Sequence, residues 1–323
     1  MRSFCQGRKT FPGARQNVFQ APATSPNFLR SASRQSHPSA LAHHHIARRQ
    51  TVFTRSILAL AVVLGISSSA LAADATPAWN EIMAAKKLTA CVVPSYQPYS
   101  AKDAAGTWSG FAVEMAKDVA KSLRVDLEYV ETSFKTVVLD IQSGKCNVFF
   151  GFNATPERAL AIDFAGPLYT LGFGALDRPG FVPKGDHWAD LNDPSIRVCY
   201  AVGNSSEQQI KRFAPKSTQV ALPKSDDCAL AIMSGRADRY IDGVMGSMGA
   251  RAKNSKLGAL HMMTPNYALP SYAGVRLDDG RFQKFLQRWV EYNRGNGNIN
   301  LWLTSSMESI GIKPESIPPE VTF

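Results

Sequence analysis

The segment Ile141-Gln-Ser-Gly-Lys-Cys-Asn147, which leads into Val148-Phe-Phe-Gly151, decides the fold because its pattern returns later in the chain. The second copy begins at Ile232 and reads Ile-Met-Ser-Gly-Arg-Ala-Asp, followed by Arg239-Tyr-Ile-Asp-Gly243. Both copies read as a helix that ends at a glycine, a basic turn and a strand. The repetition predicts two units of the same α/β construction.

The segments before the two copies correspond as well. Leu88–Val93 and Ile196–Ala201 are short apolar strands with a cysteine at the same place. The elements expected next are a helix from Phe111 with apolar residues at 111, 115, 119 and 123, a strand at 125–129, a helical stripe at 134, 137, 138 and 141, a helix from Ser205, a strand at 219–222 and a helix from Ser225. This βαβαβ pattern, present twice, predicts two mostly parallel sheets flanked by helices, with a ligand crevice at the carboxyl ends of the strands. The alternative is one doubly wound domain with a chance internal similarity.

A leader precedes this fold. Residues 57–66 form a short apolar run after Arg55, and Ala70-Leu-Ala72 has the small residues of a cleavage site. The run is shorter than the membrane span of about 20 residues, so it indicates a secretory signal peptide. We therefore expect residues 1–72 to be removed near 72/73 and the protein to be exported to the periplasm.

Charge and histidine content exclude two classes of function. Residues 1–72 contain nine of the 36 Lys and Arg residues and no acid, which leaves 27 cations against 26 anions in the remainder. This near-neutral remainder gives no electrostatic support for nucleic-acid binding. The histidines after the leader, His187 and His261, lack the spacing of metal ligands, so we expect neither a metal nor a cofactor.

Four cysteines follow the leader: Cys91, Cys146, Cys199 and Cys228. An even count in an exported chain favours disulfides over four buried free thiols, and three connectivities are possible. A disulfide across two lobes that close on a ligand would block their motion. We therefore favour Cys91–Cys146 and Cys199–Cys228, one bridge in each lobe.

Several motifs resemble one family. They are Ser95–Tyr99, Gly110–Glu114, Ser143–Asn147, Thr155–Arg158, Ile162–Phe164 and Gly235–Asp238. Together they resemble the family 3 extracellular solute-binding proteins, the polar amino-acid type of ABC importer receptor with the type II periplasmic binding fold. The resemblance runs from about Lys87 to about Arg294 and implies two lobes joined by two hinge crossings. The first lobe would comprise 73–170 and 272–323, and the second 171–271.

The resemblance gives Arg158 the central role. Thr155 and Pro156 suit the start of a helix, and a cation in its first turn is electrostatically misplaced unless an anion binds there. Arginine matches a carboxylate through two parallel hydrogen bonds. In the family the corresponding arginine holds the ligand's α-carboxylate, whereas the ordinary alternative is a surface cation or a structural ion pair.

Other ligand-binding positions follow from the same resemblance. Asn153 stands where the family often has a threonine, and Gly151 allows close approach of the ligand. Tyr96 and Phe134 correspond to aromatic residues that sandwich the ligand side chain, although core packing would also explain them. In the second lobe, Asn204 and Ser205 precede a helix whose free N–H groups would receive an anion; simple N-capping is the alternative.

The chain departs from the family where an amino-acid ligand would need an acid. The position that usually holds the ligand's ammonium with an aspartate is Gly243, and a second acidic position is Val93. Either Asp242 reaches the ligand through a bulge at Gly243, or the ligand is a carboxylate without an α-ammonium. A buried ammonium with no partner costs several kcal/mol.

These features predict a periplasmic receptor that is not an enzyme. It would bind a small carboxylate-bearing solute, an amino acid or a related organic acid, and deliver it as a monomer to an inner-membrane ABC permease. The first alternative is an accessory binding protein of a periplasmic quinoprotein dehydrogenase. The second is an enzyme resembling cyclohexadienyl dehydratase, for which Asp242 would be the general acid.

Overall fold

A computed structural model describes residues 76–277, 280–319 and 321 of the chain. The predictions of a leader, a signal peptide and a cleavage site lie outside these residues. None of the helices in the described part combines the length and apolar character needed to cross a membrane.

The first sheet has five strands in the order β5-β1-β6-β13-β7. β1 pairs in parallel with β5 and β6, whereas β13 is antiparallel to both β6 and β7. The strands are β1 Lys87–Val92, β5 Asp126–Glu131, β6 Val148–Asn153, β7 Ile162–Leu171 and β13 Leu269–Arg276. We call the part of the molecule built on this sheet the first lobe.

The second sheet repeats that construction in the order β10-β9-β11-β8-β12. β9 pairs in parallel with β10 and β11, and β8 is antiparallel to β11 and β12. The strands are β8 Phe173–Asp177, β9 Arg197–Ala201, β10 Thr218–Leu222, β11 Arg239–Gly243 and β12 Leu260–Met262. The part built on this sheet is the second lobe, and the predicted βαβαβ repeat is confirmed.

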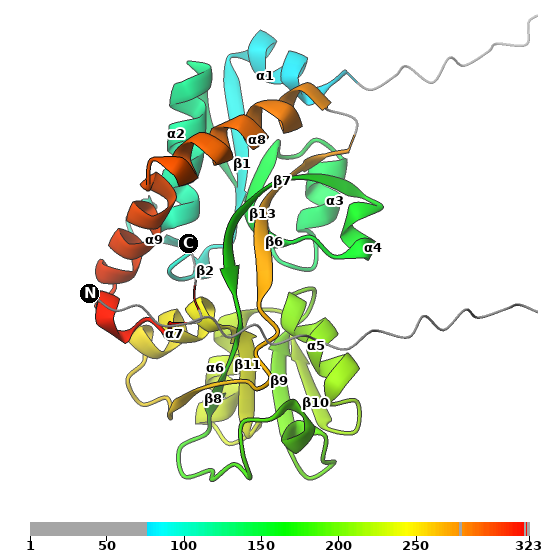
Figure 1. The fold of residues 1–323 in the computed structure, drawn as a ribbon, viewed down its shortest axis with the longest axis vertical. Coiled ribbons are helices and arrows are strands. Elements are labelled where there is room, and N and C mark those ends of the chain that lie inside the picture. Colours follow the sequence, from blue (N-terminus) through cyan, green and yellow to red (C-terminus); the bar gives the residue numbers. More distant parts are fainter. Residues whose placement is uncertain (1–75, 278–279, 320, 322–323) are drawn as a thin grey trace, which may run out of the picture. The chain divides into compact units, whose positions relative to one another are not determined.

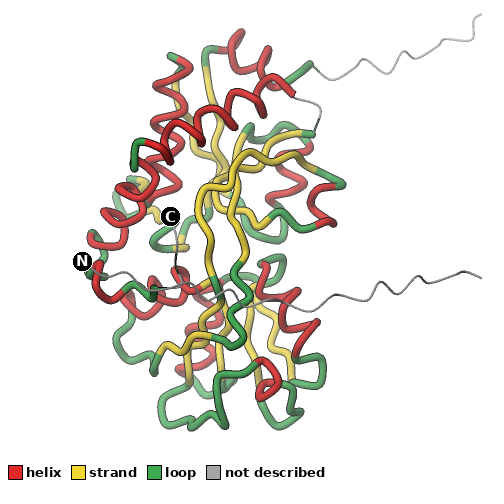
Figure 2. The backbone as a smooth tube through the Cα atoms, in the orientation of Figure 1, coloured by secondary structure: helices red, strands yellow, loops and turns green. Residues whose placement is uncertain are grey.

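Two connections join the lobes. β7 ends at Leu171 and β8 begins at Phe173, so the chain passes from the first sheet to the second almost without a turn. It returns between β12 and β13 (Figure 1). In Figure 2 both crossings appear as extended backbone between the two groups of strands. They match the two hinge crossings that the family resemblance implies.

Helices cover the sheets. In the first lobe they are α1 Ala78–Ala85, α2 Phe111–Leu123, α3 Val137–Gln142, α4 Pro156–Ala159, α8 Gly280–Gly295 and α9 Asn298–Glu308. In the second they are α5 Ser205–Phe213, α6 Ser225–Met233 and α7 Val244–Lys253. The shorter elements are β2 Ser95–Tyr96, β3 Ser100–Lys102, β4 Trp108–Ser109, η1 Trp188–Leu191 and η2 Pro314–Ser316.

The expected helices form close to the expected places, with one difference. The stripe of α2 is fully buried apart from Leu123, which keeps 7% exposure, as spacing by four residues requires. Phe134 lies before α3 rather than within it. The hydroxyls of Ser133 and Thr136 hydrogen-bond to each other at 3.0 Å in the turn that precedes the helix, and this local alternative holds Phe134 outside it.

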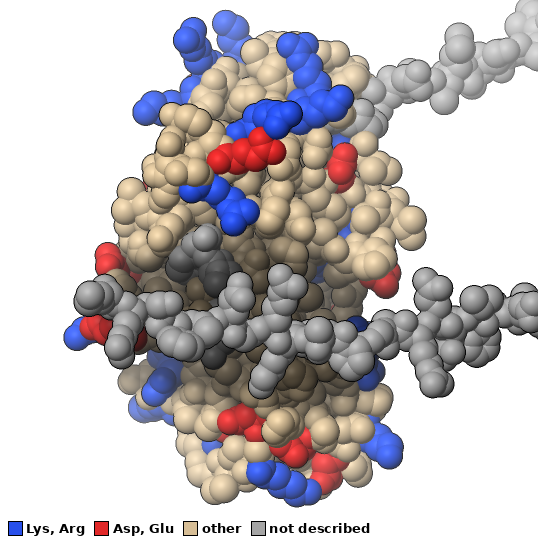
Figure 3. All heavy atoms as spheres, viewed as in Figure 1, with Lys and Arg blue, Asp and Glu red and all other residues tan. Residues whose placement is uncertain are grey.

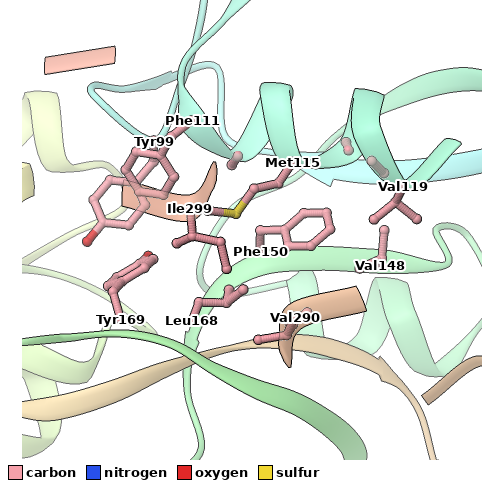
Figure 4. Close-up of a cluster of buried hydrophobic side chains, with 14 of the residues drawn as sticks. Tyr99, Phe111, Met115, Val119, Val148, Phe150, Leu168, Tyr169, Val290 and Ile299 are labelled. Carbon is pink, nitrogen blue, oxygen red and sulfur yellow. The ribbon is translucent and has the colours of Figure 1, made fainter. Parts of the chain in front are cut away.

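The first lobe has a continuous apolar core between its sheet and its helices. Figure 4 shows Met115 and Val119 of α2 beside Phe150 and Val148 of β6, with Tyr99 at one end of the cluster. The four cysteines form the two favoured bridges, Cys91–Cys146 in the first lobe and Cys199–Cys228 in the second.

Candidate functional site

Arg158 lies where the two lobes meet. Thr155 caps α4 by accepting a hydrogen bond from the Arg158 backbone N–H at 3.3 Å, and Pro156 takes the first helical position. The guanidinium donates from Nη1 to the Asn153 carbonyl at 2.9 Å and from Nη2 to the Gly203 carbonyl at 2.7 Å. One arginine therefore joins the end of β6 in the first lobe to the β9–α5 turn of the second.

Arg158 forms no salt bridge within the described part of the chain, and the neighbouring Glu157 acts on its charge only through space. Its guanidinium contacts those two carbonyl groups and the ring of Phe152, whose centroid is 5.0 Å from the guanidinium carbon. Burial lowers the pKa of Arg158 to about 10, so the group remains charged at neutral pH. Two of its five N–H donors are in use, which leaves capacity for a carboxylate.

The predicted site residues converge on a small cavity between the lobes. Its volume is about 30 Å³. It is lined by Tyr96, Tyr99, Phe134, Gly151, Asn153, Leu171, Gly172, Phe173, Asn204, Ser205, Gly243 and Ser271. Six of the eight predicted ligand-binding residues are in this set. Arg158 and Asp242 do not line the cavity, but each hydrogen-bonds to residues that do: Arg158 to Asn153, and Asp242 to Tyr96 and Asn204.

The aromatic residues of the cavity contact one another. The ring centroids of Tyr96 and Phe134 are 4.9 Å apart in an edge-to-face arrangement, and Tyr96 stacks on Tyr99 at 4.5 Å. A group held between two rings needs about 7 Å between them, twice an optimal carbon contact. In this structure Tyr96 and Phe134 therefore leave no space for a sandwiched side chain. Tyr99 is a lining residue that the sequence analysis left out, although it closes the Ser95–Tyr99 motif.

Asp242 is fully buried beneath the cavity. Its Oδ1 accepts hydrogen bonds from Asn204 Nδ2 at 2.7 Å and Tyr96 Oη at 3.1 Å, and also from the Gly243 backbone N–H at 2.8 Å. Its Oδ2 accepts from Tyr240 Oη at 2.5 Å and from Ser225 Oγ at 3.4 Å. Burial raises the pKa of Asp242 above its usual range, while these five donors oppose the shift.

β11 carries Asp242 in a regular ladder. Asp242 is opposite Gly174 and Gly243 is opposite Phe173, with no register shift in this pairing. The bulge that would have turned Asp242 into the cavity is absent from this ladder. Asp242 instead reaches the cavity indirectly, because it binds Tyr96 and Asn204, which line it.

Glycines allow the lobes to approach closely. Gly203 has a φ of +83°, and a Cβ there would lie 2.6 Å from the Phe134 carbonyl oxygen in the first lobe. On α7, a Cβ at Gly249 would lie 2.0 Å from the Gln97 carbonyl oxygen. Cβ atoms essentially never approach so closely, so only glycine fits this closed arrangement.

A larger hollow of about 620 Å³ lies between α4 and α5 and shares Asn153 with the central cavity. Gln208 Nε2 donates to Glu157 Oε2 at 3.4 Å across it, which adds to the contacts that Arg158 and Tyr96 make between the lobes. Among the described residues, no group of three His, Cys, Asp or Glu side chains is arranged to hold a metal. On the face in Figure 3, acidic and basic side chains are interspersed rather than gathered into a field of one sign.

Comparison with known proteins gives concordant matches. A model of the family described as bacterial extracellular solute-binding proteins, family 3, matches residues 88–299. The chain is 26% identical over 255 residues to the histidine-binding periplasmic protein of Salmonella typhimurium, which covers 74% of this chain and 92% of that protein. It is 21% identical over 247 residues to the cyclohexadienyl dehydratase of Pseudomonas aeruginosa, covering 76% and 91%.

Solved structures show the same fold. An ancestral amino-acid-binding protein, described as a precursor of cyclohexadienyl dehydratase, superposes with a TM-score of 0.63 and 28% identity. The match covers 72% of this chain and 98% of that one. The residues matched by the family model, 88–299, include both sheets and the residues that line the central cavity.

Proposed function

Because the chain belongs to the bacterial extracellular solute-binding proteins of family 3, we propose that it captures a small carboxylate-bearing solute at Arg158, between its two lobes. Members of this family are ligand-binding receptors that work with ABC transporters and are periplasmic or extracellular. The receptor would close on the solute and present it to an inner-membrane permease.

The observation that carries the proposal is the state of the Arg158 guanidinium. It is charged, largely desolvated and without a salt bridge in the described residues, and it holds only two carbonyl groups. Burial of a charge is costly unless a partner compensates it. A ligand carboxylate supplies that compensation in a bidentate geometry.

Several relatives are named for amino acids, including histidine and glutamine. We do not propose the same ligands for this chain, because Gly243 lines the cavity at the position where an acid would hold a ligand ammonium. No Asp or Glu occurs among the described lining residues. The proposal is therefore limited to the carboxylate that amino acids and organic acids share.

The division of the chain into 73–170 with 272–323 and 171–271 is part of the same proposal. So are cleavage of residues 1–72 and a monomeric state. Closure would be a hinge motion at the two crossings between the sheets. The close contacts at Gly203 and Gly249 represent the closed end of that motion.

Thermal unfolding of the purified protein tests the carboxylate site. A ligand present at 100 times its Kd adds about 2.7 kcal/mol to the unfolding free energy, which is easily detected. We expect stabilisation by at least one member of a panel of small carboxylates, and its loss in Arg158→Ala. Arg236→Ala is the matched control, because Arg236 is exposed and remote from the cavity lining. Equal responses of the two variants would overturn the proposal.

The relative that is a dehydratase makes enzymatic activity the second candidate. Such chemistry needs a proton donor that reaches the ligand. Asp242 is covered by Tyr96 and Asn204 and accepts five hydrogen bonds, which favours a binding protein over an enzyme. Incubation with a cyclohexadienyl acid should leave its ultraviolet spectrum unchanged; appearance of an aromatic product would support the enzyme.

A further inference from the structure

We propose that the space between the lobes, made of the central cavity and of Arg158 behind its Asn153 wall, selects a short 2-hydroxycarboxylate. Its carboxylate binds Arg158 and its hydroxyl donates a hydrogen bond to Tyr96 Oη. This proposal rests on the proposed function and names the solute class for the same site. Tyr96, which Asp242 orients, holds the ligand group that an acid at position 243 would otherwise hold.

Size limits the solute to a few carbon atoms. Tyr96, Tyr99 and Phe134 pack against one another and fill the space where a ligand side chain would be held. The remaining cavity is about 30 Å³. The lobes must separate to admit any solute, and the close contacts at Gly203 and Gly249 re-form only if the bound solute does not hold the lobes apart.

Asp242 has no hydrogen-bonding capacity left for a ligand. A carboxylate offers about four lone-pair sites, and five donors already point at the two Asp242 oxygens. Four of the five come from the side chains of Tyr96, Asn204, Tyr240 and Ser225. A ligand ammonium could bind Asp242 only by displacing one of them.

Tyr96 becomes a hydrogen-bond acceptor toward the cavity. Its hydroxyl proton is committed to Asp242 Oδ1 at 3.1 Å, and the Asn204 amide also donates to the same oxygen, which leaves one lone pair for a ligand. This oxygen lies 4.0 Å from the position of a Cβ on Gly243, and Tyr99 Oη lies 3.9 Å from it. A side chain at 243 would therefore point at the two tyrosine hydroxyls, and a ligand group there meets them.

A hydroxyl suits this environment better than an ammonium. A hydroxyl has one proton to donate, and Tyr96 offers the acceptor for it. An ammonium has three protons and a charge, and the described lining residues include no acid to balance that charge. A buried ammonium would be left partly unpaired, whereas a neutral donor would be satisfied.

Isothermal titration with matched solutes tests the proposal. The two sets are glycolate, glycine and acetate, and L-lactate, L-alanine and propionate, each differing only at the 2-position. We expect glycolate or L-lactate to bind at least tenfold more tightly than both of its analogues. Tyr96→Phe removes the acceptor and keeps the ring, so the advantage of the hydroxy acid over acetate or propionate should fall below threefold. Tyr129→Phe is the control, because Tyr129 Oη is buried without a hydrogen-bond partner among the described residues and does not line the cavity.

The outcomes separate this proposal from the broader one. Arg158-dependent binding of glycine or L-alanine in preference to the hydroxy acids would overturn the assignment of the solute class and leave the carboxylate receptor in place. A hydroxy-acid preference that persists in Tyr96→Phe would overturn the role of Tyr96. Binding only of longer carboxylates would refute the size argument. No binding by any member of the panel would count against both proposals.

Discussion

At the scale of single residues, Asp242 links the stability of the protein to pH. Burial raises its pKa in the folded state above the usual value of about 3.9. A raised folded pKa contributes stability that is complete below the unfolded pKa and is lost as pH rises through the folded pKa. The tyrosines that face it, Tyr96 and Tyr240, stay neutral throughout, since burial raises their pKa values too.

Asp242→Asn removes this titration. We expect the unfolding free energy of the wild type, relative to that of the variant, to decrease as pH increases from about 3 to 7, measured by urea denaturation at several pH values. Asp126→Asn, at an exposed site, should show no comparable trend. An increase in the difference with rising pH would mean that the five donors outweigh burial.

At the scale of secondary structure, helix propensity and packing favour different residues at position 249 of α7. Alanine in a helix interior is favoured over glycine by about 1 kcal/mol. A Cβ at 249, however, would lie 2.0 Å from the Gln97 carbonyl oxygen, so α7 could no longer approach the first lobe.

We therefore expect Gly249→Ala to weaken ligand binding at least tenfold by isothermal titration while the free protein remains folded. Gly295→Ala is the matched control: it lies at the end of α8 with open space around its Cβ position, and its affinity should be unchanged. If both variants bind like the wild type, the approach of α7 is not required for capture.

At the scale of the whole molecule, each lobe has its own disulfide. The bridged cysteines are 55 residues apart in the first lobe and 29 in the second. Loop-closure entropy predicts about 4 kcal/mol for each. Because the bridges lie in different lobes, the losses from the two double Cys→Ala variants should add in the quadruple variant, within about 0.5 kcal/mol by urea unfolding. A clearly non-additive loss would show that the two bridges are energetically coupled across the lobes.

The sequence was sufficient for the architecture because the repeated pattern and the apolar spacing are local signals. Two βαβαβ units predict parallel pairing among β1, β5 and β6 and among β9, β10 and β11, which the structure shows, although they leave the order of the strands open. The position of β13 between β6 and β7 could not be inferred, because nothing near residue 269 specifies its neighbours. The bridge partners were predicted by reasoning about lobe motion rather than from spacing.

The sequence predicts which residues form the candidate site, but not how these residues contact one another. Residues such as Asn153 and Asn204 follow from the family resemblance, and both line the cavity. The packing of Tyr96 on Phe134 and Tyr99 depends on how far the lobes close, which no short segment determines. The role of Asp242 depends on donors from four separate segments, so its five hydrogen bonds became visible only in three dimensions.

The place of β13 also determines the order in which the protein can fold during synthesis. β6 and β7 lie on either side of a strand that begins at Leu269, after the whole of the second sheet has been made. Until that strand arrives, both carry unpaired backbone edges of the kind that invite aggregation. The second lobe can thus be complete while the first still lacks one of its inner strands. Any truncation before residue 269 would make the exposed edges permanent.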